Sequence, residues 1–213
     1  MLWNAKNDRV PLREGAMPYV SFGNGPRKLI ILPGLSDGLA TVQGKALLLA
    51  GPYRPFFQDF TVYMFSRKEP LPSNHSIRDM AADQAEALEA LGLQRVSVLG
   101  VSEGGMVAQY LAIDHPELVE KLVLAVTAPC MNDLIRSCLS GWMDMAGRGN
   151  HGALMIDTAE RSYSPTYLKN TESCTLFWAT WESPSPMTAF SPMPGPSSPS
   201  MLLRSFPRSS VPL

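Results

Sequence analysis

The sequence predicts an α/β protein with a mostly parallel sheet, and three observations carry this prediction. Apolar strand-like segments alternate with segments of helical periodicity between residues 28 and 126. The strand-like segments are continuously apolar, which is typical of strands covered on both faces. The chain has 213 residues and is 45% hydrophobic, which is enough for one domain with a sizeable core.

Three strands are predicted first. Residues 17–23 (MPYVSFG) alternate weakly between apolar and polar positions and predict an edge strand. Residues 28–32 (KLIIL) form an apolar run that stops at Pro33-Gly34, which predicts a buried strand leading into a loop. Residues 60–65 (FTVYMF) predict a third strand, because they are rich in β-branched and aromatic residues.

Two helices and two further strands follow. Residues 76–92 predict an amphipathic helix, in which Ser76 and Asp79 have the spacing of a capping box and Gly92 is suited to the C-terminal end. Residues 95–100 and 121–126 predict buried strands. Residues 103–114 predict a second helix, which ends before Pro116 because a helix interior does not tolerate proline.

One motif indicates chemistry. Residues 100–104 read Gly-Val-Ser-Glu-Gly, which matches G-x-S-x-G between a predicted strand and a predicted helix. A nucleophilic serine at this place sits on a strained turn, and Gly100 and Gly104 allow the strand and the helix to pass closely. A serine that only capped the helix would explain Ser102 but not the paired glycines. We therefore interpret Ser102 as the nucleophile of an elbow.

A second loop lies where an oxyanion hole would need it. Leu32-Pro33-Gly34-Leu35 follows a buried strand, and a tetrahedral intermediate requires two donors aimed at its oxyanion. The backbone N–H groups of Leu35 and Glu103 are the candidate donors, although a tight turn alone would also explain the Pro-Gly pair. The side chain of Glu103 is expected to orient the elbow and not to act as an acid.

These segments resemble the α/β-hydrolase fold family, in particular its small esterase-like members. LIILPGLSDG is similar to the family's oxyanion loop, and VLGVSEGGMVAQYLAIDHPELVEKLVLAV is similar to its elbow, the following helix and the next strand. The resemblance covers roughly residues 17–170. It implies an α/β-hydrolase-type sheet and hydrolysis of an ester or similar acyl bond, and it leaves C–C hydrolysis, acyl transfer and cofactor-free haloperoxidase activity open. It also implies that the triad runs from serine to an acid and then to a histidine.

The acid and the histidine cannot be assigned. His75 and His115 precede the region where the family places its histidine, and the resemblance makes His115 part of a structural helix ending. His151, Asp133 and Asp157 fall in sequence similar to the family's cap and are poor candidates. Since a serine hydroxyl without a base is a weak nucleophile, we expect impaired activity. The alternative is a non-catalytic hydrolase-like binding protein or a non-functional fragment.

The chain is predicted to have three parts. Residues 1–128 form the core with the elbow, residues 129–172 a partial helical cap and residues 173–213 a disordered tail. From Ser183 onward, nine serines and eight prolines fill 31 residues without an acid. An out-of-frame reading beyond about residue 172 would explain this tail and a sheet that is incomplete at the C-terminus, although low complexity alone could also produce it.

Charge and cysteine content argue against other classes of protein. Eighteen basic and 19 acidic residues give a net charge of −1, so we expect no nucleic acid partner. We also expect no membrane partner, since no segment approaches the length of an apolar span. Cys130, Cys138 and Cys174 match no metal spacing, which favours reduced thiols and a cytoplasmic location. The expected partner is a small-molecule acyl substrate, with no metal or cofactor.

Overall fold

The computed structural model describes residues 2–35 and 41–170. These residues fall into two compact units, which divide between Cys130 and Met131. The first unit contains a sheet with helices, and the second contains three helices. The predicted tail, residues 173–213, lies outside the described residues.

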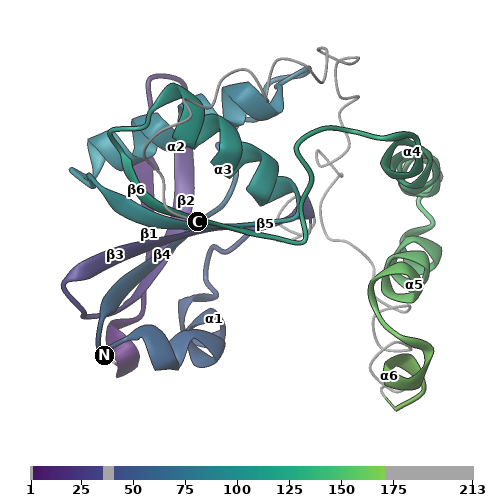
Figure 1. Ribbon diagram of the computed structural model, residues 1–213, viewed down its shortest axis with the longest axis horizontal. Helices are drawn as coiled ribbons and strands as arrows, with labels where there is room; N and C mark the ends of the chain where they lie inside the picture. Colours follow the sequence, from purple (N-terminus) through teal and green to yellow (C-terminus); the bar gives the residue numbers. More distant parts are fainter. Residues whose placement is uncertain (1, 36–40, 171–213) are drawn as a thin grey trace. The chain divides into compact units, whose positions relative to one another are not determined.

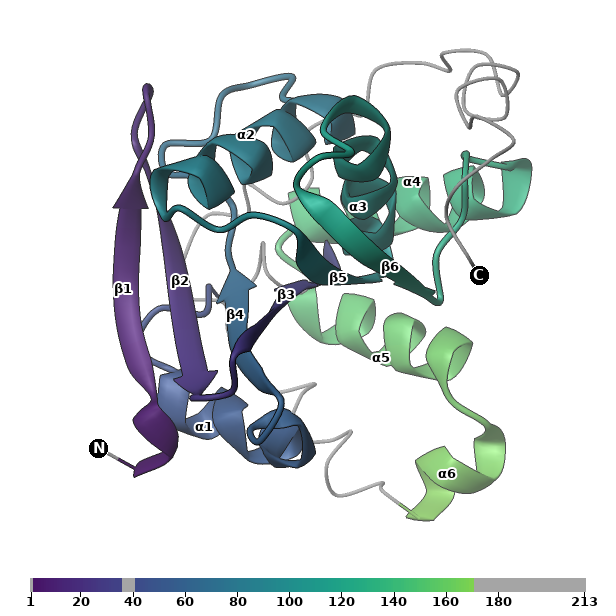
Figure 2. The same ribbon diagram turned by 60° about the vertical axis from the view of Figure 1, so that its left-hand side comes forward.

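A mixed sheet organises the described part of the first unit. Its strands are β1 (Lys6–Pro11), β2 (Ala16–Gly23), β3 (Arg27–Leu32), β4 (Phe60–Phe65), β5 (Val96–Val101) and β6 (Val119–Ala125). They lie in the order β1-β2-β4-β3-β5-β6, with β1 at one edge and β6 at the other (Figure 2). The pairs β1–β2 and β2–β4 are antiparallel, whereas β4, β3, β5 and β6 are parallel. The predicted α/β class with a mostly parallel sheet is confirmed.

Helices cover both faces of this sheet. They are η1 (Leu2–Asn4), α1 (Ala46–Ala50), η3 (Gly51–Phe56), α2 (Ile77–Ala90) and α3 (Glu103–Asp114). Figure 1 shows α2 and α3 on one face and α1 on the other. Ile30 and Ile31 of β3 belong to two different buried clusters, because successive side chains of a strand point to opposite faces. A strand between two helical layers therefore needs a continuously apolar sequence.

Most of the predicted elements of this unit are confirmed. The strands expected at 28–32, 60–65, 95–100 and 121–126 correspond to β3, β4, β5 and β6, and the two helices correspond to α2 and α3. In α2, the Ser76 hydroxyl accepts a hydrogen bond from the Asp79 N–H, and the Asp79 carboxylate accepts one from the Ser76 N–H. Gly92 adopts a positive φ of 64° just beyond the helix. The capping box and the C-terminal glycine therefore predict both ends of α2 correctly.

Two expectations about the strands were wrong. Residues 17–23 do not form an edge strand, since β2 is paired on one side with β1 and on the other with β4. The edge is β1, whose sequence KNDRVP is mostly exposed and has no apolar run that the sequence analysis could detect. The expectation that the parallel strands are covered on both faces is wrong for β6, because Val123 and Leu124 are exposed to 55% and 43%, as a sheet that is incomplete at the C-terminus predicts. Helices α1 and η3 were not predicted.

The described part of the second unit is helical. Its described helices are α4 (Asp133–Gly147), α5 (His151–Ser162) and α6 (Pro165–Asn170). The side chains of Asn132 and Asn150 cap α4 and α5 by accepting a hydrogen bond from the backbone N–H of the third residue of each helix. Trp142 of α4 donates a hydrogen bond of 2.6 Å to Asp157 of α5, which links the two helices. Hydrogen bonds from Arg161 and then Trp142 hold the pKa of Asp157 below its usual range.

Candidate active site

Ser102 occupies a strained turn between β5 and α3. Its φ of 53° and ψ of −118° lie in a region that residues with a Cβ rarely adopt, at a cost of about 1–3 kcal/mol. Its side chain makes no capping hydrogen bond to α3. The structure therefore does not use Ser102 as an ordinary helix cap, which was the alternative interpretation of the motif.

The motif glycines lie at points where the backbone has no room for a side chain. A Cβ on Gly100 would approach the Gly104 carbonyl oxygen and the Ala108 side chain to less than 3.0 Å. A Cβ on Gly104 would collide with the carbonyl oxygens of Leu32 and Pro33. These contacts pack α3 directly onto β5 and onto the end of β3, so the elbow depends on both glycines.

The loop after β3 lies against the elbow. A Cβ on Gly34 would stand 3.1 Å from the Ser102 Cβ and 3.6 Å from its hydroxyl oxygen. Leu35, the candidate oxyanion donor, is the next residue, and Glu103 directly follows the serine at the start of α3. The structure thus brings together the two loops from which the predicted donors come.

The end of β6 braces the elbow from one side. The Ser102 N–H donates a hydrogen bond of 3.0 Å to the Ala125 carbonyl, and the Thr127 hydroxyl donates one of 2.6 Å to the Ser102 carbonyl. The Thr127 side chain also fills the space beside Gly105. Thr127 is not among the predicted site residues, although it follows a parallel strand whose carboxyl end meets the same sheet edge as the elbow.

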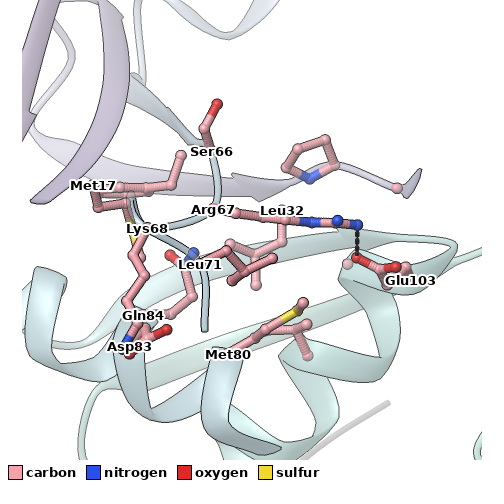
Figure 3. A pocket seen from close by; sticks show the side chains of 15 residues that line it. Met17, Leu32, Ser66, Arg67, Lys68, Leu71, Met80, Asp83, Gln84 and Glu103 are labelled. Atoms are coloured by element: carbon pink, nitrogen blue, oxygen red, sulfur yellow. Dashed lines mark hydrogen bonds and ion pairs between the residues drawn. The ribbon is translucent and has the colours of Figure 1, made fainter. Parts of the chain in front are cut away.

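An ion pair braces the elbow from the other side. Arg67, in the loop after β4, places its Nη2 atom 2.6 Å from the Oε1 atom of Glu103, and both side chains are largely buried. Figure 3 shows the Arg67 side chain extending past Leu32 towards Glu103. Arg67 is likewise not among the predicted site residues, although it also follows the carboxyl end of a parallel strand.

The pocket in Figure 3 lies beside the elbow, and its lining includes Gly34, Glu103 and Gly104. Its volume of about 30 Å³ has room for about two water molecules. Its lining includes the Gln84 side chain, whose Oε1 atom is buried without a hydrogen-bond partner among the described residues. Lys68 and His75 contact the Asp83 carboxylate at 2.9 and 2.6 Å, and all three side chains are nearly buried. This cluster ties the loop after β4 to α2.

No histidine of the described residues hydrogen-bonds to the Ser102 hydroxyl. His75 Nε2 contacts Asp83, and His115 lies at the C-terminal cap of α3 with its Nδ1 atom 3.7 Å from Glu117. His151 belongs to the other compact unit, where its Nδ1 atom is buried without a partner in the described part of the chain. The described residues therefore supply the nucleophile loop and the oxyanion loop, but no assigned base.

Within residues 2–35 and 41–170, no three His, Cys, Asp or Glu side chains gather in a way that could hold a metal ion. None of the helices described there combines the length and the apolar character that crossing a bilayer requires.

Comparison with known proteins identifies the family. The family model for the alpha/beta hydrolase fold matches residues 29–148, which span β3 to α4 and include the elbow. The chain belongs to the alpha/beta hydrolase fold family. The resemblance inferred from the oxyanion loop and the elbow is thereby confirmed.

Two of the curated proteins similar to this chain are a dehalogenase and a putative carbamate hydrolase. The chain is 34% identical over 110 residues to a fluoroacetate dehalogenase of a Burkholderia species, covering 50% of this chain and 36% of that protein. It is 35% identical over 78 residues to a putative carbamate hydrolase RutD of Serratia proteamaculans, covering 37% of this chain and 29% of the relative. The chain thus spans about a third of the length of these relatives.

Solved structures support the fold. An enol-lactonase from Burkholderia xenovorans LB400 matches with a TM-score of 0.69 at 14% identity, covering 86% of this chain and 70% of that one. An alpha/beta hydrolase from a deep-sea metagenome library matches with the same TM-score at 17% identity, covering 86% and 70%. At these identities the similarity concerns the fold alone.

Proposed function

We propose that this chain carries the nucleophile and the oxyanion hole of a serine hydrolase that acts on an ester or similar acyl bond. The observation that carries the proposal is the conformation of Ser102. A strained serine between a buried strand and a helix N-terminus, with no capping bond, is what an exposed nucleophile requires. The neighbouring Gly34 supports the same proposal, because it brings a second loop to the serine.

The reaction follows from these positions. The Ser102 oxygen attacks the carbonyl carbon of the substrate and loses its proton to a base. The backbone N–H groups of Leu35 and Glu103 stabilise the resulting oxyanion, and the positive end of α3 adds to this stabilisation. The leaving alcohol takes the proton, and water then hydrolyses the acyl-serine to a carboxylic acid and free enzyme.

The serine itself restricts the chemistry. Attack on a carbonyl leaves an ester on Ser102, which water can hydrolyse by the same route. Displacement of a halide from a saturated carbon would leave an ether, which offers no carbonyl for water to attack. Acyl-bond hydrolysis is therefore proposed here, and the activity in the name of the dehalogenase relative is not transferred to this chain.

A second candidate function is a hydrolase-like protein without catalysis. One specific observation favours it: in the described part of the chain no histidine hydrogen-bonds to Ser102, and without a base the hydroxyl is a weak nucleophile. The elbow would then form part of a binding surface for small acyl compounds.

Modification by a fluorophosphonate and hydrolysis of p-nitrophenyl acetate separate the two candidates. We expect the purified chain to form a phosphonate adduct on Ser102, identified by peptide mass, and to hydrolyse the ester slowly. Ser102→Ala should lose the adduct, and its hydrolysis should fall to the rate in buffer. Ser97→Ala removes a hydroxyl from the same strand, β5, and should leave both signals unchanged. Equal rates for the wild type and Ser102→Ala would favour the non-catalytic protein.

A further inference from the structure

A buried ion pair stands directly beside the elbow. The Arg67 and Glu103 side chains are 13% and 8% exposed, and 2.6 Å separates their nearest charged atoms. A buried charge is costly unless it is paired, so each partner strongly restricts where the other can lie. The pair therefore forms a stiff connection between the loop after β4 and the first residue of α3 (Figure 3).

The position of Glu103 matters for the proposed chemistry because its backbone N–H is one of the two proposed oxyanion donors. Its neighbour Ser102 is held through the backbone by Ala125 and Thr127 at the end of β6. The side chain of Glu103 is instead held from the β4 side by Arg67. Ser102 is thus held from the β6 side and Glu103 from the β4 side. Together these contacts fix the orientation of the peptide group that joins Ser102 to Glu103.

That peptide carries the Glu103 N–H, one of the two proposed oxyanion donors. We propose that Arg67 is a positioning residue, which holds this N–H on the oxyanion through its ion pair with Glu103. The inference rests on the proposed function, because it assumes that Ser102 is the nucleophile. It goes beyond that function in assigning a role to a residue outside both motif loops.

A second and more exposed ion pair on α3, with side chains 62% and 22% exposed, provides a control. Arg78 of α2 donates hydrogen bonds of 2.8 and 2.7 Å to Asp114, the last residue of α3. Both pairs join an arginine outside α3 to a carboxylate on α3, but only the Arg67 pair touches the residue beside Ser102. Loss of the Arg78–Asp114 pair shows how a broken ion pair on α3 affects the stability of the protein while the contact between Arg67 and Glu103 is kept.

The experiment compares Arg67→Met, the double variant Arg67→Met with Glu103→Gln, and Arg78→Met. For each we measure the Tm, the rate of fluorophosphonate modification of Ser102, and kcat and KM for p-nitrophenyl acetate, well below the Tm. The double variant removes both buried charges, so it should recover much of the Tm that Arg67→Met loses. It tests the role of Arg67 even where the single variant does not fold.

We expect both Arg67 variants to modify Ser102 at least about tenfold more slowly than the wild type and to lower kcat with little change in KM. Arg78→Met should change the Tm less than Arg67→Met, because the Arg78 pair is largely exposed, and should keep the wild-type rate. Wild-type rates in a folded double variant would overturn the positioning role and leave Ser102 as the nucleophile. Absence of any adduct in the wild type would overturn the proposed function and this inference together.

Discussion

At the scale of single residues, Gly104 shows how closely the elbow is packed. A Cβ at this position would meet two carbonyl oxygens of the backbone at the end of β3, which cannot move away as a flexible side chain could. We expect Gly104→Ala to lower the free energy of unfolding by at least about 3 kcal/mol, more than ordinary overpacking of a core. Urea denaturation followed by circular dichroism measures this change.

The control for this substitution is Gly141→Ala. Gly141 lies in α4, and a Cβ there would meet nothing within 4 Å. Alanine favours a helix by about 1 kcal/mol over glycine, so this variant should be at least as stable as the wild type. Equal stability of Gly104→Ala and the wild type would contradict the close approach of α3 to β3.

At the scale of elements, the N-terminus of α2 depends on the hydrogen bonds between Ser76 and Asp79. The side-chain hydrogen bond from Ser76, followed by the one from its backbone, lowers the pKa of Asp79. The folded state therefore favours the ionised carboxylate. The stabilisation is complete above the unfolded pKa of about 4 and is lost as the pH falls through the lower folded pKa.

Asp79→Asn tests this cap. At pH 7 the substitution should lower the free energy of unfolding by about 1 kcal/mol, since it removes the charged acceptor at the positive end of the helix. The difference from the wild type should shrink when the pH is lowered below about 4, because the wild-type carboxylate then becomes protonated. Thermal unfolding at a series of pH values measures the loss of stability at pH 7 and its decrease at lower pH. A difference that stays constant from pH 7 to pH 3 would show that the charge is not responsible.

The elements that the sequence predicted share a physical property. Strands between two helical layers must be apolar throughout, and helices such as α2 carry their own end signals, so both are visible in a single sequence. The strand β1 is polar and exposed, and α1 has five residues, which is too short for a clear helical period. Their positions depend on long-range pairing that local patterns do not contain.

The site was predictable to the same extent. Ser102, Gly100 and Gly104 belong to one contiguous motif, and Gly34 lies in a loop that ends a clearly apolar strand. The contacts of Arg67 and Thr127 with the elbow join segments 25 or more residues apart in the sequence. Such contacts follow from strand order, because the carboxyl ends of β4, β3, β5 and β6 meet at one edge. Local patterns in a single sequence do not distinguish these residues from the others that follow each strand.

At the scale of the whole molecule, β6 is the strand of the described sheet that exposes apolar side chains at an unpaired edge. Val123 and Leu124 are successive residues and point to opposite faces of the sheet, yet both are exposed. In the described part of the chain, β6 pairs with β5 on one side and with no strand on the other. An apolar, unpaired edge strand is a template for association with other chains.

We therefore expect Val123→Lys to reduce association, because a lysine on an edge strand opposes pairing with a second chain. The fraction of protein that remains in the supernatant after expression and centrifugation should rise, and light scattering on warming should fall. Leu2→Lys adds the same charge at another exposed position, outside the sheet, and should change neither quantity. If both substitutions raised solubility equally, net charge and not the β6 edge would govern association of this chain.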